Sequence, residues 1–232
     1  MTEEATTVVD AFGTPVEIRP GFWGALALLW ALMTWVAGRG HPERPFLVRL
    51  AVGFLSGLAM ISADVGHALA HTVSARMAGG PTDRIVLSHG MPRTLYEDNA
   101  VPPAMHRGRS LGGPIFSGVS LLAALVSRSL APQDSIIREV LTWSAVGHAF
   151  IFGGCLAPLP FVDGGVLLKW SLVDAGRSAD EADIIVQEVD LAAGAALAAS
   201  GVALATTRHK LPALALLAGG IVAIGAGLGK IR

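Results

Sequence analysis

The sequence predicts an all-α polytopic membrane protein with about six transmembrane helices, and two observations support this fold class. Hydrophobic residues make up 52% of the 232 residues and charged residues only 15%, with a mean hydropathy of +0.57. This composition is unusual for a soluble domain of such length. Six apolar segments are also long enough to cross a bilayer as helices. They cover residues 21–38, 46–78, 110–127, 140–157, 191–207 and 211–229.

The first two segments have clear boundaries. Residues 21–38 are free of charge, lie between Arg19 and Arg39, and carry Trp residues near both ends, as expected at membrane interfaces. Residues 46–78 exceed the roughly 20 residues that a bilayer needs, so this helix should tilt or project. Gly79-Gly80-Pro81 should end it. The polar loop that follows contains a short apolar run, Ile85–Leu87, which predicts a strand.

The third and fourth segments surround an expected pocket. Gly112-Gly113-Pro114 marks the entry of the third helix, and the fourth helix ends at Pro158 and Pro160. These prolines interrupt the helix at membrane depth, where irregular backbone is tolerated only against protein or a wet cavity. Asp163 and Gly164 follow at once. A polar pocket is therefore expected near the end of the fourth helix.

The remaining segments complete the predicted organisation. An acidic stretch should form a solvated linker helix, and two segments rich in small residues should pack as a final hairpin. The expected parts are an N-terminal tail (1–20), a first helix with its loop (21–45), a core (46–173), the acidic linker (174–190) and the hairpin (191–232).

Composition also excludes several classes. The net charge of −1 and the absence of a basic run argue against nucleic-acid binding. A single cysteine, Cys155, rules out an intrachain disulfide framework. Glu3, Glu4 and Asp10 occupy the region where a secretory leader would be basic, so no cleavable leader is predicted. The distribution of Lys and Arg favours both termini in the cytoplasm, and the Arg-rich composition is typical of a bacterial membrane protein.

Three ionisable side chains interrupt the second apolar segment. Asp64, His67 and His71 have the spacing i, i+3, i+7, which places them within a stripe of about 60° on one helix face. Ionisable residues inside a membrane are usually functional. We expect these three side chains to converge on one ligand.

Three stretches together resemble the site-2 protease family of intramembrane zinc metalloproteases. The family pattern H-E-x-G-H-A-x-A is similar to residues 63–70, the helix entry A-G-P to residues 112–114, and N-x-x-P-x-P-x-x-D-G-G to residues 155–165. Their order and spacing agree across about residues 51–168. The resemblance implies a three-helix core in the second to fourth segments and zinc-assisted cleavage of a transmembrane peptide.

The chain departs from the family at key positions. A zinc peptidase needs three protein ligands, an open position and a carboxylate base. Ala63 stands where the family has its first His, the shorter Asp64 replaces the base Glu, and Cys155 replaces the Asn. Only His67 and Asp163 match family ligands. We therefore expect lost or impaired proteolysis in a pseudoprotease that binds transmembrane segments of a regulatory partner.

Two arrangements would keep an active zinc protease. In the first, His67, His71 and Asp163 hold Zn²⁺ and Asp64 acts as base or fourth ligand, because the two histidines keep the i, i+4 spacing. In the second, His148 supplies the missing imidazole. The strand at Ile85–Leu87 would then present an edge to an unwound substrate, as the family's loop does. The expected pocket residues are Ala63, His148, Cys155, Pro158, Pro160 and Gly164.

Simpler interpretations remain open. Both histidines could be satisfied within the bundle, with Asp64 paired to one of them. Asp163 could be the N-cap of a helix starting at Gly164, and Cys155 a small packing residue. A small transporter using Asp64 and Asp163 is a third possibility, less favoured because the chain shows no internal repeat.

Overall fold

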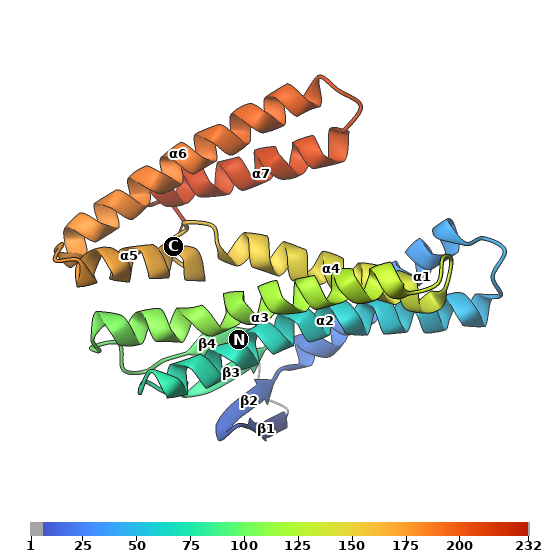
Figure 1. The fold of residues 1–232 in the computed structure, drawn as a ribbon, viewed down its shortest axis with the longest axis horizontal. Coiled ribbons are helices and arrows are strands. Elements are labelled where there is room, and N and C mark those ends of the chain that lie inside the picture. The colour runs from blue at the N-terminus through green and yellow to red at the C-terminus, as the bar shows by residue number, and fades with distance from the viewer. Residues whose placement is uncertain (1–6, 232) are drawn as a thin grey trace. The chain divides into compact units, whose positions relative to one another are not determined.

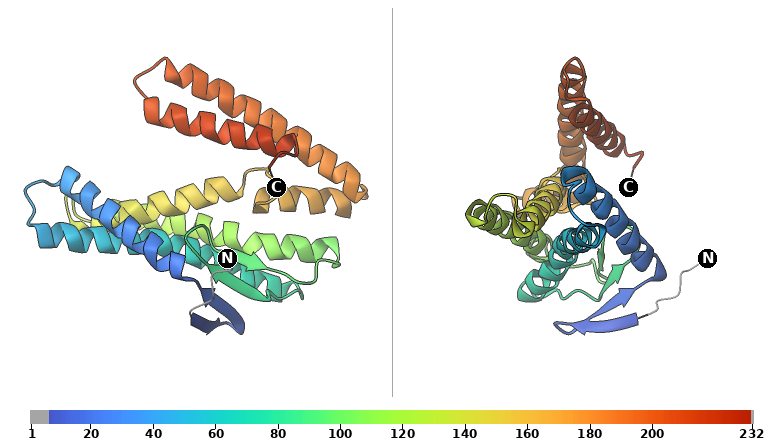
Figure 2. Two further views of the ribbon diagram at one scale, coloured as in Figure 1. Left: turned by 180° about the vertical axis from the view of Figure 1, so that it is seen from behind. Right: turned by 90° about the vertical axis from the view of Figure 1, so that its right-hand side faces the viewer.

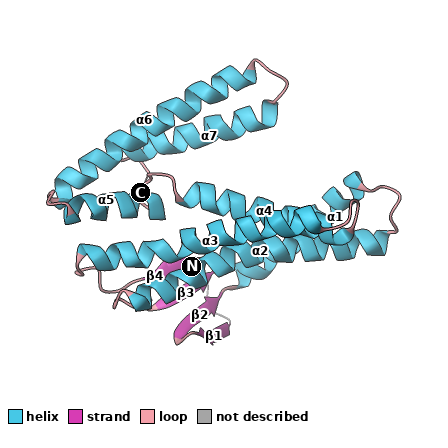
Figure 3. Ribbon diagram, viewed as in Figure 1, coloured by secondary structure: helices cyan, strands magenta, loops and turns pink. Residues whose placement is uncertain are grey.

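A computed structural model describes residues 7–231. Glu3 and Glu4, on which part of the leader argument depends, lie outside the described residues. The chain divides into two compact units, Met1–Val101 with Leu111–Gly153, and Pro102–Ser110 with Gly154–Arg232. Figure 1 labels the helices and strands, and Figure 3 separates them by colour.

Five helices in the described part of the chain are long and apolar enough to cross a membrane, which confirms the predicted polytopic class. They are α1 (Pro20–Gly40), α2 (Phe46–Met77), α3 (Pro103–Leu130), α6 (Ala179–Ala205) and α7 (Lys210–Gly227). The predicted fourth span is the helix α4 (Ile136–Cys155), which is not among the five. The charged Arg138 and Glu139 in its first turn, together with His148, lower its hydropathy. A shorter helix, α5 (Asp163–Asp174), follows it.

The helix α2 ends where its sequence predicts. Gly79 has a φ of +82°, a left-handed conformation that glycine adopts without steric cost. Its N–H donates to the Arg76 carbonyl, and the Gly80 N–H donates to the Ala75 carbonyl, each at 3.0 Å. These bonds satisfy carbonyls that the end of the helix leaves without partners. The glycine pair therefore stops α2 just before the polar loop.

A four-stranded sheet packs beside α2 in the first unit. Its strands are β1 (Thr7–Ala11), β2 (Thr14–Ile18), β3 (Arg84–Leu87) and β4 (Arg93–Leu95), in the order β1-β2-β3-β4. The predicted strand is confirmed as β3, but the prediction that it presents a free edge is wrong. β3 pairs in parallel with β2 and antiparallel with β4, so β4 is the edge strand on that side.

The strands β1 and β2 occupy residues that the sequence analysis treats as a tail. They form a hairpin through Phe12 and Gly13, both with positive φ (55° and 70°), as in the tight turns that suit a two-residue hairpin. Asp10 accepts a hydrogen bond from the Gly13 N–H at 2.8 Å. The turn lacks the Asn-Gly or Asp-Gly signal, so the sequence pattern did not reveal it.

The sheet fixes the orientation of α2. A small core joins Val16 of β2 and Ile85 and Leu87 of β3 to Ala68 of α2, with Val65 and Leu69 packed around it. Since these α2 residues face the sheet, the opposite face of α2 is left for α3. The predicted histidines lie on that remaining face.

In the second unit, α6 and α7 form an antiparallel hairpin that is visible from three directions in Figures 1 and 2. A Cβ on Gly220 would lie 2.8 Å from the Ala198 backbone nitrogen, so the helices approach at backbone distance. The acidic stretch does not form a separate linker helix. Ser178 and Glu181 make a capping box that starts α6, and the helix then continues without a break into the apolar segment.

Candidate functional site

Two of the three predicted intramembrane side chains meet on the face of α2 opposite the sheet. The Nε2 atoms of His67 and His71 lie 3.1 Å apart and share a hydrogen bond. Their rings are edge-on, with centroids 4.7 Å apart. His71 is buried, at 6% exposure. One helical turn therefore presents two imidazole nitrogens to one point in space.

The helix α3 closes over this histidine pair because it carries glycine at the contact. A Cβ on Gly113 would lie 2.5 Å from His67 Nε2 and would also overlap the His71 ring. A Cβ on Gly112 would overlap the Ala70 carbonyl, and the Gly112 N–H donates to Ser74 Oγ at 3.1 Å. Gly112 and Gly113 therefore form a surface of α3 that packs against α2. It is not the helix entry that the sequence suggested, because α3 begins at Pro103 and Pro114 lies inside it.

Ser117 of α3 is a site residue that sequence reasoning missed. Its side chain is fully buried, and its Oγ lies 3.0 Å from His67 Nδ1. Gly113 and Ser117 have the spacing i, i+4, so both face α2. A small polar residue one turn after a glycine on an apolar helix was the available signal. Its partner lies 50 residues away, which local patterns do not reveal.

Asp64 lies one turn before His67 on α2 and reaches a cavity of its own. It lines a cavity of about 290 Å³ formed by α1, α2 and the turn after β3, and neither His67 nor His71 is among the lining residues. Most of the wall is apolar, including Phe22 of α1 and Met91 after β3. The described residues donate no hydrogen bond to the Asp64 carboxylate. The structure brings the two imidazoles together, and the convergence of all three side chains on one ligand stays a prediction.

Ala63 is buried in a close contact between two helices. Ala63 has 0% exposure, and a Cβ on Gly147 of α4 would lie 3.5 Å from the Ala63 Cβ. The small side chain thus suits a close contact between α2 and α4. The structure places the next residue, His148, in a buried position at 6% exposure beside Phe116 of α3, with ring centroids 5.7 Å apart. Within the described chain, its Nδ1 has no hydrogen-bond partner.

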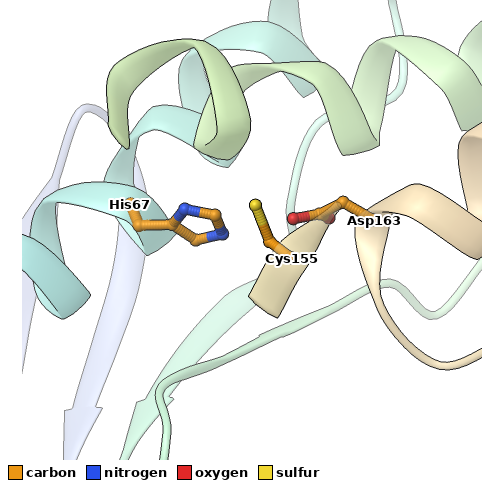
Figure 4. A group of neighbouring side chains, drawn as sticks. All are labelled: His67, Cys155 and Asp163. Carbon is orange, nitrogen blue, oxygen red and sulfur yellow. The ribbon is translucent and has the colours of Figure 1, made fainter. Parts of the chain in front are cut away.

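The second motif forms a tight turn between α4 and α5 in the second unit. Cys155 Sγ and a carboxylate oxygen of Asp163 lie within 4.8 Å of each other. Figure 4 shows these two side chains, with His67 of the first unit also labelled. A Cβ on Gly164 would lie 2.5 Å from the Leu156 carbonyl oxygen, and one on Gly165 would overlap the Leu159 carbonyl. The glycines therefore let α5 start directly on this turn.

The N-cap interpretation of Asp163 requires a correction. The N-cap of α5 is Val162, and Asp163 is the first helical residue. Its carboxylate at the first turn is favourable for the helix dipole, so a structural role and a ligand role are both compatible with its place. Pro158 and Pro160 lie in the turn itself, where the Val162 N–H donates to the Leu159 carbonyl at 3.2 Å.

The donor types fit a zinc ion. Two nitrogens bound at 2.0–2.1 Å to one tetrahedral zinc lie about 3.3 Å apart, close to the 3.1 Å between the histidine Nε2 atoms. When His67 Nδ1–H donates to Ser117 Oγ, the Nε2 lone pair is left for a metal, as is usual for histidine ligands. A thiolate and a carboxylate, as offered by Cys155 and Asp163, are also zinc ligands.

The comparisons with known proteins bear on the fold. No family model matches the sequence, and no curated protein matches it. Among solved structures, the site-2 protease from Methanocaldococcus jannaschii is similar to this chain, with a TM-score of 0.55 and 13% sequence identity. The similarity covers 99% of this chain and 96% of that chain. At this identity the likeness concerns the fold alone, and the chain is an integral membrane protein with a site-2 protease-like fold.

Proposed function

We propose that this protein binds a transmembrane segment of a partner protein and that its peptide-hydrolysing activity is lost or strongly reduced. The observation that carries the proposal is the state of positions 63 and 64. Ala63 offers no ligand and is packed against α4. Asp64 is one methylene shorter than the glutamate of the family pattern, which draws its carboxylate back toward α2. A carboxylate displaced from the metal-binding atoms by even an ångström loses much of its value as a base.

The partner's segment fits the cavity beside α1. A volume of about 290 Å³ accepts one or two large apolar side chains, and Phe22, Val65 and Met91 supply apolar walls. The carboxylate of Asp64 adds a polar group that selects a hydrogen-bond donor on the bound segment. The unpaired side of β4 gives an unwound stretch of the same segment a strand to join.

A second function is compatible with the 3.1 Å between the Nε2 atoms of His67 and His71, which are also hydrogen-bonded to each other. In this alternative the protein is an active zinc-dependent intramembrane protease. His67, His71 and Asp163 hold the metal, and Cys155 is available as a further ligand. Zinc, when bound, would polarise a peptide carbonyl and activate water. Ser117 would orient His67, and Asp64 would take a proton.

A cleavage assay separates the two functions. The full chain is reconstituted in proteoliposomes with a fluorescent synthetic single-span peptide containing a central Gly-Pro pair. We expect no product above that of a chelator-treated sample, with Asp64→Asn indistinguishable from wild type. If a chelator-sensitive product forms and Asp64→Asn abolishes it, the protein is the active enzyme of the second alternative.

Zinc content provides an independent measurement. Elemental analysis of the purified protein should give about one zinc per chain for the second alternative, lost in His67→Ala, His71→Ala and Asp163→Ala. The exposed His209, in the connection between α6 and α7, provides the matched control His209→Ala. The proposed binding function requires no zinc.

We also propose that the protein lies in a bacterial cytoplasmic membrane with both termini in the cytoplasm. The Lys and Arg distribution supports this orientation. This orientation requires an even number of spans, so α4 has to cross the membrane in addition to the five helices that are long and apolar enough to span it. Reporter fusions at each terminus would give the same cytoplasmic signal, and opposite signals would refute the orientation.

A further inference from the structure

Another cavity, lined by polar residues, lies in the first unit at the connection between α3 and α4. It has a volume of about 200 Å³. Its lining residues are polar or charged throughout: His41, Arg128, Gln133, Asp134, Ser135, Arg138, Glu139 and Thr142. None of them belongs to the histidine pair or to the cavity beside α1. The proposed function therefore leaves this site without a role.

The cavity is rich in hydrogen-bond donors. Arg128 Nε donates to Thr142 Oγ1 at 2.8 Å, and no other described residue accepts a hydrogen bond from this guanidinium. Arg138 Nη1 donates to the Arg128 and Ala131 carbonyls, each at 3.0 Å, which fixes its guanidinium at the cavity wall. Ser135 Oγ accepts from the Arg138 backbone N–H at 3.2 Å and so caps the first turn of α4, which begins beside the cavity. Two guanidinium groups thus have donors to spare.

The cavity lining carries two arginines, Arg128 and Arg138, and two carboxylates, Asp134 and Glu139. The carboxylate of Glu139 is engaged by Arg44 at 2.6 Å, and Glu43 accepts from His41 at 3.1 Å. Asp134 is exposed. The acidic groups therefore leave the two cavity arginines without a close counter-ion.

The level of the cavity relative to the membrane spans identifies a ligand class. The segments 41–45 and 131–135 connect α1 to α2 and α3 to α4, and α1, α2 and α3 are apolar enough to span a membrane. The side chains of these connections therefore lie where lipid headgroups begin. Guanidinium forks and a helix N-terminus match phosphate oxygens. We propose that this cavity binds a phosphate group, supplied by an anionic phospholipid headgroup or by free phosphate.

Binding of a fluorescent phosphatidylglycerol to the full chain in dodecyl maltoside micelles tests the site. Arg128→Gln should weaken binding about tenfold, because charge-assisted bonds are lost, and Arg128→Lys should weaken it less. Arg208→Gln, at an exposed position between α6 and α7, should have no effect. Size-exclusion profiles equal to that of wild type show that the variants fold.

The competition arm identifies the source of the phosphate. Inorganic phosphate that displaces the labelled lipid at millimolar concentration assigns the cavity to free phosphate, and a lack of displacement assigns it to the lipid headgroup. Equal affinity of wild type and Arg128→Gln for both labelled lipid and inorganic phosphate overturns the proposal. The result of this binding experiment does not depend on whether the protein hydrolyses peptides or binds a partner's transmembrane segment.

Discussion

The contact between α2 and α3 and the hairpin of α6 and α7 are both close helix pairs made possible by glycine, yet they differ in what the glycines face. A Cβ on Gly113 would overlap two imidazoles. A Cβ on Gly220 would meet only backbone atoms of Gly194 and Ala198. Close approach of two helices is therefore a packing feature that is common in membrane proteins and does not by itself indicate a functional site. It contributes to a site only where the partner helix carries polar side chains.

The two pairs also treat buried polar groups differently. His67 uses both ring nitrogens, one toward Ser117 and one toward His71. Asp190 of α6 has 0% exposure, and neither carboxylate oxygen has a hydrogen-bond partner among the described residues. The first arrangement satisfies its polar groups. The second leaves a polar group that costs stability.

The largest expected effect is that of Gly113→Val. The new side chain has to displace both imidazoles or separate α2 from α3, so the free energy of unfolding should fall by about 3 kcal/mol or more. Thermal unfolding in detergent measures the change. Gly153→Ala in α4, where nothing lies within 4 Å of the new Cβ, is the matched control and should be neutral or slightly stabilising. Equal unfolding temperatures for both variants would contradict the close contact assigned to Gly113 between α2 and α3.

Asp190→Val should act in the opposite direction. Removing an unsatisfied buried carboxyl group should raise the free energy of unfolding by about 1–3 kcal/mol. The exposed Asp180 in the first turn of α6 provides the control Asp180→Val, which should be neutral or slightly destabilising because it weakens the helix dipole interaction. A lower unfolding temperature for Asp190→Val would show that Asp190 has a partner that stabilises the hairpin.

Ser117→Ala should have a smaller cost. The His67 Nδ1 would lose its partner in a buried contact, which should lower the free energy of unfolding by about 1–2 kcal/mol. Ser129→Ala, on the same helix at an exposed position, should change stability by less than about 0.5 kcal/mol. The same melts in detergent compare them. No difference between the two serines would contradict the role assigned to Ser117.

The parts of the fold that could be predicted depend on local signals. The apolar segments, the end of α2 at Gly79 and the strand β3 all follow from short stretches of sequence. The central position of β3 could not be predicted, because it depends on pairing with β2, which lies more than 60 residues earlier. A hairpin turn at Phe12-Gly13 carries no standard signal either.

The candidate site also has a part that local sequence signals predict and a part that depends on tertiary packing. Helical spacing predicted that His67 and His71 would meet, because both lie one turn apart on the same helix. The spacing placed Asp64 within about 60° of them, but the cavity that Asp64 lines is formed by α1, α2 and the turn after β3, which local spacing could not predict. Ser117 was missed because it reaches His67 from another helix. Local periodicity predicts faces, and tertiary packing decides which side chains share a site.

Photo-crosslinking tests the central claim most directly. Benzoylphenylalanine is introduced in place of Met91, which is exposed and lines the cavity beside α1. The control position is the exposed Leu214 on α7. Each protein is reconstituted with the same fluorescent single-span peptide and zinc, irradiated and analysed by mass. The account predicts that the protein substituted at position 91 forms an adduct with the intact peptide and that the protein substituted at position 214 forms none. An adduct carrying a shortened peptide, or equal labelling at both positions, would contradict it.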